Sequence, residues 1–367
     1  MSLPSMFVMM LLACTGAQGP DDAHDDKVDV EKPKKGGGKK GGKDKGGNDD
    51  KGGNGGKGDV GDPDLKKPGK NPDILPEARG RLEKSSDKPT KDYTNFRPPK
   101  KKGNCIGQGR YKFQMPGYDS RSLLIVPDGP TPRTLVVALH GGGGDSKKIL
   151  EQTRWDSLAI QEGGVAVLAP EGAAIDKAES KWNSGKWDDA DHVDTSNARD
   201  DVKYLDELVR YVSDAVCVER VVAVGFSNGA QMTYRWACQG SEVDAAITSA
   251  GTLLVDPKTC KNQVPFRAYI GTNDDLYDSS PLEGADQPNA VKSLELMAKQ
   301  NGCDLSKEPD MAARGAQTCK AYKGCKAPTV LCEIDGYPHG HPVPWGKKPT
   351  DDCDATQEGW SWMAKQL

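Results

Sequence analysis

Apolar residues divide the chain into a polar front and a patterned remainder. Between residues 31 and 70 only Val60 and Leu65 are hydrophobic, whereas 14 of the chain's 43 glycines and 12 lysines fall there. So few apolar side chains cannot bury enough surface to offset the entropy of an ordered chain. We therefore predict a disordered Gly/Lys/Asp-rich tether over residues 15–103, followed by one folded domain over residues 104–367.

In the second part, short apolar runs alternate with segments of helical spacing. Strands are predicted at 121–127, 134–140, 164–170, 219–226, 245–251, 266–271 and 329–334, and helices at 147–161, 201–212, 229–238, 290–300 and 356–366. Near-continuous apolar strands separated by helices are typical of a mostly parallel sheet with helices on both faces. The predicted class is α/β, with functional residues at the carboxyl ends of the strands.

The first residues contain a short apolar run that ends in Leu11-Leu12-Ala13-Cys14. This run resembles the bacterial lipobox, in which the cysteine becomes the lipidated first residue, and it is too short for a permanent membrane-spanning helix. We expect residues 1–14 to be a lipoprotein-type signal segment lipidated at Cys14. The protein would then be exported and anchored at the outer membrane or cell surface, or otherwise be secreted or periplasmic. The alternative is an uncleaved apolar N-terminus with a chance cysteine.

Nine further cysteines are dispersed along the chain, and none forms a CxxC pair with the spacing of a zinc site. In an exported domain such cysteines indicate disulfides and no metal site, with at least one cysteine left unpaired. The formal net charge is −4, and the positive charge is concentrated in residues 31–103. The acidic folded part does not fit nucleic-acid binding.

Gly225-Phe226-Ser227-Asn228-Gly229 follows an apolar strand and precedes a predicted helix. A serine at such a strand-to-helix turn is a candidate nucleophile, because the flanking glycines permit a sharp turn that exposes its hydroxyl. The helix start also offers backbone N–H groups to an oxyanion. A structural turn is the alternative.

A second glycine-rich stretch, Leu139-His140-Gly141-Gly142-Gly143-Gly144, follows another predicted strand. Backbone N–H groups left free by such glycines suit the second half of an oxyanion hole. A phosphate-binding P-loop is disfavoured, because Ser146 stands where the glycine before the lysine is required. We expect His140 to be structural rather than a catalytic base.

An acid and a base should follow the serine in the order Asp, then His. Asp274 and Asp275 come after the strand at 266–271, and His339 and His341 come after the strand at 329–334. The acid would orient the imidazole and stabilise its cation, and the histidine would carry the proton. At this point either histidine could be the base.

Over residues 105–345 the chain resembles one family. The resemblance is carried by six stretches: LHGGGG, WNSGKW, DDVKYLDELV, VVAVGFSNGAQMTYRWAC, IGTND and LCEIDGYPHGHP. The family is the secreted polyhydroxybutyrate-depolymerase and feruloyl/acetylxylan-esterase group of α/β-hydrolases, which is carbohydrate esterase family 1-like. The resemblance implies an α/β-hydrolase fold and a reaction that needs no cofactor. It assigns Ser227 as nucleophile, Asp274 as acid, His339 as base with His341 as second choice, and the N–H groups of Gly142 and Asn228 as oxyanion donors.

The resemblance also implies a Cys238–Cys260 disulfide, whereas the pairing of Cys303, Cys319, Cys325 and Cys332 stays open. Trp182 and Trp187 are candidates for stacking on a sugar or an aromatic acyl group, with core packing as the alternative.

These observations predict an exported, monomeric serine esterase. Its substrates would be acetyl or feruloyl esters on polysaccharide side chains, or short polyhydroxyalkanoate esters, in a polymer or a small molecule. Membrane contact would be through the lipid anchor. The alternatives are a peptidase on the same fold and a non-catalytic surface lipoprotein.

Overall fold

The computed structural model describes residues 69–77, 82, 93–99, 104–176, 179–185, 199–278, 288–344 and 353–367. The predictions for the signal segment, for Cys14 and for Trp187 lie outside these residues. None of the helices in the described ranges has the length and apolar character that crossing a bilayer requires.

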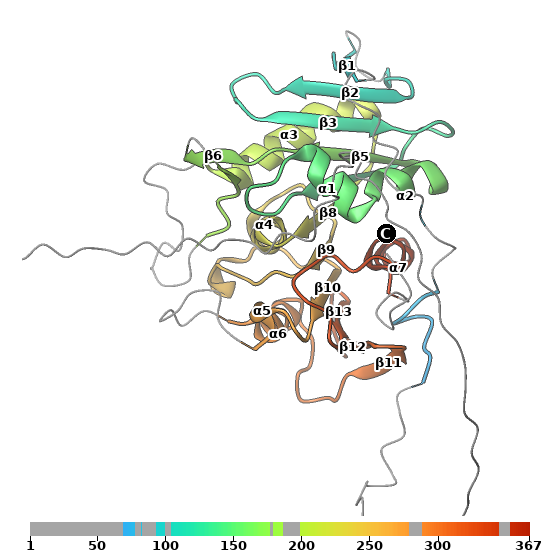
Figure 1. Ribbon diagram of the computed structural model, residues 1–367, viewed down its shortest axis with the longest axis vertical. Coiled ribbons are helices and arrows are strands. Elements are labelled where there is room, and N and C mark those ends of the chain that lie inside the picture. The colour runs from blue at the N-terminus through green and yellow to red at the C-terminus, as the bar shows by residue number, and fades with distance from the viewer. Residues whose placement is uncertain are drawn as a thin grey trace, which may run out of the picture. The chain divides into compact units, whose positions relative to one another are not determined.

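Within the described residues one large sheet has the strand order β1-β2-β3-β5-β4-β8-β9-β10-β13-β12-β11 (Figure 1). From β5 through β4, β8, β9 and β10 to β13 every neighbouring pair is parallel. The strands are β1 (Thr94–Asn95), β2 (Gly109–Gln114), β3 (Arg121–Val126), β4 (Thr134–Leu139), β5 (Val165–Pro170), β8 (Arg220–Phe226), β9 (Ala245–Ser249), β10 (Phe266–Gly271), β11 (Asp310–Arg314), β12 (Gln317–Ala321) and β13 (Thr329–Ile334). A separate antiparallel pair comprises β6 (Ala173–Asp176) and β7 (Glu179–Lys181).

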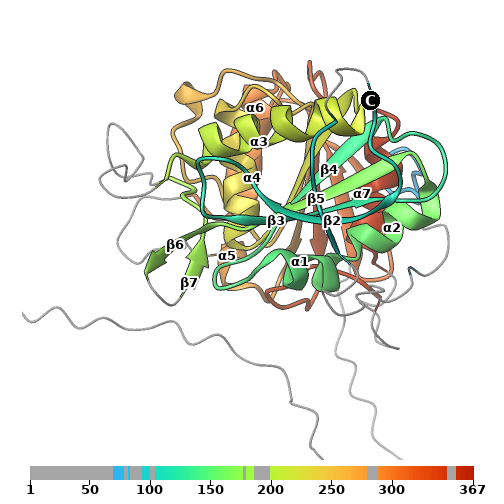
Figure 2. The same ribbon diagram turned by 90° about the horizontal axis from the view of Figure 1, so that it is seen from above.

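Helices cover both faces of the sheet, as the turned view makes clear (Figure 2). They are α1 (Ser146–Thr153), α2 (Trp155–Glu162), α3 (Asp201–Val216), α4 (Asn228–Gln239), α5 (Asp275–Asp278), α6 (Ala290–Gln300) and α7 (Ala355–Met363). Apolar residues of α3, α4 and α6 pack in one buried cluster, and those of α1, α2 and α7 pack in another. The predicted architecture, a mostly parallel sheet with helices on both faces, is therefore confirmed.

The predicted helix over 147–161 is wrong in one respect, because the structure divides it into α1 and α2 at Arg154. This residue adopts a left-handed conformation, with φ 58° and ψ 29°. Its buried guanidinium donates to the carbonyl of Leu82 at 3.1 Å. The break therefore lets the Arg154 guanidinium point inward to the Leu82 carbonyl. The helical spacing of apolar residues in the sequence gives no sign of this contact.

The predicted tether over residues 15–103 is wrong where the structure describes this part of the chain, at residues 69–77, 82 and 93–99. Ile74, Leu75, Leu82, Tyr93 and Phe96 are buried in the two apolar clusters. Scattered apolar side chains in a polar stretch can thus pack against a surface supplied by the rest of the domain.

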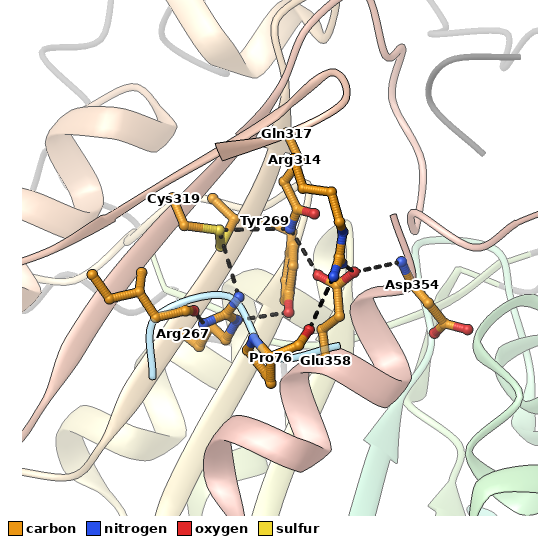
Figure 3. The surroundings of a disulfide bond; sticks show 10 residues. Pro76, Arg267, Tyr269, Arg314, Gln317, Cys319, Asp354 and Glu358 are labelled. Carbon is orange, nitrogen blue, oxygen red and sulfur yellow. Dashed lines mark hydrogen bonds and ion pairs between the residues drawn. A yellow bond between two sulfur atoms is a disulfide. The ribbon is translucent and has the colours of Figure 1, made fainter. Parts of the chain in front are cut away.

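Two arginines of the sheet hold the backbone of this N-terminal segment (Figure 3). Arg267, which is fully buried on β10, donates to the carbonyl of Ile74 at 2.8 Å, and Arg314 on β11 donates to that of Pro76 at 3.2 Å. Arg314 also pairs with the buried Glu358 on α7. The domain boundary therefore lies N-terminal to residue 104.

Four disulfides join described cysteines: Cys105–Cys217, Cys238–Cys260, Cys303–Cys325 and Cys319–Cys332. The implied Cys238–Cys260 pair is confirmed, and the open pairing of the other four is resolved. Cys353 is the free cysteine among the described residues, and it is buried.

Candidate active site

Ser227 lies at the turn between β8 and α4 with φ 55° and ψ −122°, a strained conformation for a residue with a side chain. A Cβ on Gly225 would lie 2.3 Å from the carbonyl oxygen of Gly229, and a Cβ on Gly229 would lie 2.1 Å from that of Leu139. Both positions therefore require glycine. The backbone N–H of Ser227 donates to the carbonyl of Ser249 at 3.0 Å, which fixes the turn to β9.

His339 connects the serine to a carboxylate. Its Nε2 lies 3.0 Å from Ser227 Oγ, and its Nδ1 lies 2.9 Å from Asp274 Oδ2. Because an ionised carboxylate only accepts, Nδ1 carries the proton and Nε2 is left to accept the serine hydroxyl. The Asp274 side chain is 1% exposed and its Oδ1 accepts the backbone N–H of Leu276, whereas the His339 side chain is 43% exposed.

The sheet brings these residues together because they follow the carboxyl ends of the parallel strands β8, β10 and β13. The loops after β10 and β13 are in close contact. Asn273 N–H donates to the carbonyl of Tyr337 at 3.0 Å, and a Cβ on Gly271 would lie 1.9 Å from that same oxygen. Glycine at 271 therefore lets the loop of the acid approach the loop of the histidine.

His341, the second choice for the base, lies elsewhere. It is buried, and its Nδ1 and Nε2 lie 2.9 Å from Ser249 Oγ and Thr356 Oγ1 respectively. Burial, with a smaller contribution from the charge of Arg154, lowers the pKa of His341 to about 3. Both ring nitrogens are engaged by residues other than Ser227, so the geometry favours His339.

The predicted oxyanion donors lie beside the serine. A Cβ on Gly141 would lie 3.2 Å from Ser227 Cβ, and a Cβ on Gly142 would lie 3.9 Å from Asn228 Cβ. The N–H of Asn228, at the first position of α4, has no intrahelical acceptor. Within the described residues neither it nor the Gly142 N–H donates to a backbone carbonyl, whereas the N–H groups of Gly143 and Gly144 do.

His140 is buried, and it has the surroundings expected of a structural residue. Its Nε2 accepts the backbone N–H of Gly172 at 2.9 Å, and its Nδ1 lies 2.7 Å from the carbonyl of Gly141. The pKa of His140 is lowered, mainly because the imidazole is buried. The imidazole therefore stays neutral and fixes the loop that begins at Gly141.

The interpretation of Trp182 as a stacking platform is wrong, because the residue is only 2% exposed. Its indole N–H donates to the carbonyl of His140 at 2.9 Å, and its ring packs beside that imidazole with centroids 5.2 Å apart. A tryptophan in sequence alone gives no signal that separates these two roles.

Sequence reasoning missed Ser249 and Phe226. Ser249 supports the turn at Ser227 through its carbonyl, and the Phe226 ring lies 5.3 Å from that of His339. The available signal was their position at the carboxyl ends of β9 and β8. Within the described ranges no group of three or more His, Cys, Asp or Glu side chains is arranged to hold a metal ion.

No protein family model matches the chain. It is 32% identical over 157 residues to feruloyl esterase B of Piromyces equi, covering 38% of this chain and 29% of the relative. It is 26% identical over 161 residues to the bifunctional acetylxylan esterase/xylanase XynS20E of Neocallimastix patriciarum, covering 44% of this chain and 21% of the relative. The chain thus spans less than a third of the length of these two relatives.

Among solved structures, the acetyl xylan esterase of Aspergillus awamori superposes with a TM-score of 0.46 at 13% identity, over 61% of this chain and 90% of that chain. The order of the parallel strands, with a serine at the sharp turn after β8, gives the present chain the α/β-hydrolase fold.

Proposed function

We propose that the protein is a serine esterase that hydrolyses carboxylic esters through an acyl-enzyme. The observation that carries this proposal is the continuous hydrogen-bonded series from Ser227 Oγ through His339 to Asp274, with separations of 3.0 and 2.9 Å. A serine hydroxyl becomes nucleophilic when an adjacent base removes its proton. The esterases among the relatives add support.

In the first half of the reaction, Ser227 Oγ attacks the ester carbonyl while its proton passes to His339 Nε2. Asp274 accepts from Nδ1, holds the ring in place and stabilises the imidazolium. The N–H groups of Gly142 and Asn228 donate to the oxygen on which negative charge develops. The tetrahedral intermediate then expels the alcohol, which takes the proton from His339.

In the second half, a water molecule replaces the alcohol. His339 Nε2 removes its proton as it attacks the acyl-serine, and the same two backbone N–H groups stabilise the second oxyanion. Collapse of this intermediate releases the carboxylic acid and returns the proton to Ser227. The 43% exposure of the His339 side chain is compatible with water reaching the base.

The proposed substrates are acetyl or feruloyl esters on polysaccharide side chains, with short polyhydroxyalkanoate esters as the second class. The names of the two relatives, a feruloyl esterase and an acetylxylan esterase, favour the first class. We further propose export, with lipid anchoring at Cys14 and a flexible tether. Four disulfides in one domain are typical of an oxidising compartment outside the cytosol.

The test compares hydrolysis of p-nitrophenyl acetate by the wild type and by Ser227→Ala. Ser241→Ala is the matched control, because that hydroxyl is exposed and bonds to Asp206 instead of a histidine. We expect Ser227→Ala to lose activity and Ser241→Ala to retain it. Equal rates for wild type and Ser227→Ala would exclude the serine mechanism. A panel of methyl ferulate, acetylated xylan and hydroxybutyrate oligomers would then rank the substrate classes.

A further inference from the structure

Trp182 contacts both loops that supply the proposed oxyanion donors. Its indole Nε1–H donates to the carbonyl of His140 at 2.9 Å, two residues before Gly142. Its backbone N–H donates to Asn228 Oδ1 at 2.8 Å, and its carbonyl accepts from Asn228 Nδ2 at 3.3 Å. One residue is therefore hydrogen-bonded to the Gly142 loop on one side and to the first residue of α4 on the other.

Residues on either side of Trp182 repeat this pattern. The carbonyl of Ser180 accepts the backbone N–H of Gly143 at 2.9 Å, and Ser184 Oγ accepts from Asn228 Nδ2 at 3.3 Å. We call residues 180–184 the bracing segment. Within the described residues its hydrogen bonds to the backbone of the Gly142 loop and to Asn228 involve the Gly143 N–H, the His140 carbonyl and the Asn228 side chain, so they do not use the backbone N–H groups of Gly142 and Asn228.

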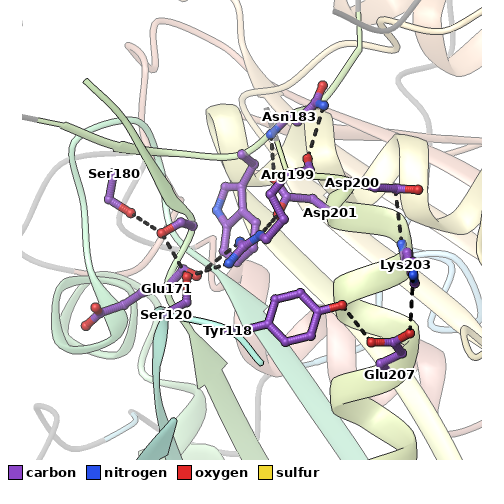
Figure 4. Close-up of polar contacts among 12 residues, drawn as sticks. Tyr118, Ser120, Glu171, Ser180, Asn183, Arg199, Asp200, Asp201, Lys203 and Glu207 are labelled. Carbon is purple, nitrogen blue, oxygen red and sulfur yellow. Dashed lines mark hydrogen bonds and ion pairs between the residues drawn. The ribbon is translucent and has the colours of Figure 1, made fainter. Parts of the chain in front are cut away.

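The bracing segment is itself fixed to α3 and α4 by buried polar groups. Figure 4 shows Asn183 of this segment beside Asp201 at the start of α3. Asn183 N–H donates to Asp201 Oδ2 at 2.7 Å, and the Asn183 carbonyl accepts from Arg235 Nη1 at 2.5 Å. Arg199 Nε donates to Asp201 Oδ1 at 2.5 Å, and the Asp201 side chain is 1% exposed. Satisfied buried networks of this kind make a local structure rigid.

We propose that Trp182 is a positioning residue that sets the separation and direction of the two oxyanion donors. This inference rests on the proposed function and assigns Trp182 a role other than substrate binding. Misplacing a donor weakens only the interaction with charge that develops in the transition state. Disturbing Trp182 should therefore lower kcat and leave KM nearly unchanged.

The test uses Trp182→Phe, which keeps an aromatic ring but removes the indole N–H together with part of the bicyclic ring. Trp236→Phe is the matched control: Trp236 is fully buried, and its indole N–H donates to Asp206 Oδ1 at 2.7 Å, away from the Gly142 loop. With p-nitrophenyl acetate we expect Trp182→Phe to lower kcat by about 10- to 100-fold with KM within about twofold of wild type. Trp236→Phe should keep the wild-type kcat although it also loses a buried hydrogen bond.

Asn228→Ala supplies a second variant in case Trp182→Phe does not fold. It removes the side chain that pairs with the Trp182 backbone and keeps the backbone N–H that donates to the oxyanion. We expect the same selective loss of kcat. The proposal is overturned if the folded variants keep wild-type kcat, or if Trp236→Phe loses as much as Trp182→Phe. These outcomes differ from failure of the proposed serine mechanism, in which wild type and Ser227→Ala would be equally active.

Discussion

Ser249 and His341 are joined by a hydrogen bond of 2.9 Å between Oγ and Nδ1, while the carbonyl of Ser249 accepts the backbone N–H of Ser227. Nε2 of His341 bonds to Thr356 on α7. His341 therefore links the strand end that supports the serine turn to a helix on one face of the sheet. His339, two positions earlier, instead reaches Ser227 and Asp274 from an exposed loop.

The two histidines should respond differently to the same substitution. We expect His339→Gln to lower kcat for p-nitrophenyl acetate by about 10²- to 10⁴-fold, because it removes the base that accepts the serine proton. His341→Gln should keep kcat within about threefold of wild type while reducing stability, because it disturbs a buried pair of hydrogen bonds. Steady-state kinetics and thermal unfolding of both variants check this. The opposite ranking of kcat would make His341 the base.

The buried His341 should also make stability depend on pH. Its pKa is lowered to about 3 in the folded protein, against about 6.5 for an unfolded histidine. Below pH ~6.5 the unfolded chain binds a proton that the folded protein does not. The stability contributed by the neutral histidine is therefore complete above that pH and is lost as pH falls toward 3, by about 1.4 kcal/mol per pH unit.

Urea unfolding of wild type and His341→Gln over a pH series measures this effect. The variant should be less stable at neutral pH, and the difference from wild type should shrink as the solution is acidified. A difference in the free energy of unfolding that stays constant with pH would mean that His341 is not the titrating group.

The turn at Ser227 should tolerate no side chain at Gly229. The added Cβ would meet the backbone of β4, with the Leu139 carbonyl oxygen 2.1 Å away. We expect Gly229→Ala to cost about 3 kcal/mol or more of folding free energy and to abolish hydrolysis. Gly107→Ala is the control, because no atom lies within 4 Å of its added Cβ. It should change stability by no more than about 0.5 kcal/mol.

The N-terminal boundary of the folded domain can be tested by truncation. A chain that begins at residue 69 should unfold at the same temperature as the full chain, whereas one that begins at 104 should be less stable by at least about 3 kcal/mol. The shorter chain lacks buried Ile74, Leu75 and Phe96, and it deprives Arg267 of a carbonyl acceptor. Equal stability of the two truncated chains, measured by calorimetry, would place the boundary at 104.

Much of the fold could be predicted because the central strands are buried on both faces and appear as continuous apolar runs. All seven strands expected from such runs are present, from β3 through β13. Among the described strands, six were missed: β1, β2, β6, β7, β11 and β12. Of these, β2, β11 and β12 carry mixed polar and apolar residues at half-exposed positions. A pattern of apolar residues indicates burial, and these strands, which lie at or next to the two edges of the sheet, are less buried than the central ones.

At the candidate site, the motif around Ser227 and the positions of Asp274 and His339 after strands could be read from the chain. The choice between His339 and His341 could not, because both follow the same strand. The role of Trp182 was equally hidden, since a buried tryptophan and a tryptophan that binds substrate look the same in sequence. Such choices depend on contacts between segments that are distant in the chain.

The most direct test of the central claim, that His339 activates Ser227, is covalent labelling with a p-nitrophenyl phosphonate followed by peptide mapping by mass spectrometry. We expect one adduct per chain, located on Ser227, formed much more slowly in His339→Gln and at nearly the wild-type rate in His341→Gln. An adduct on another residue, or labelling of Ser227 that is as fast in His339→Gln as in wild type, would contradict the account.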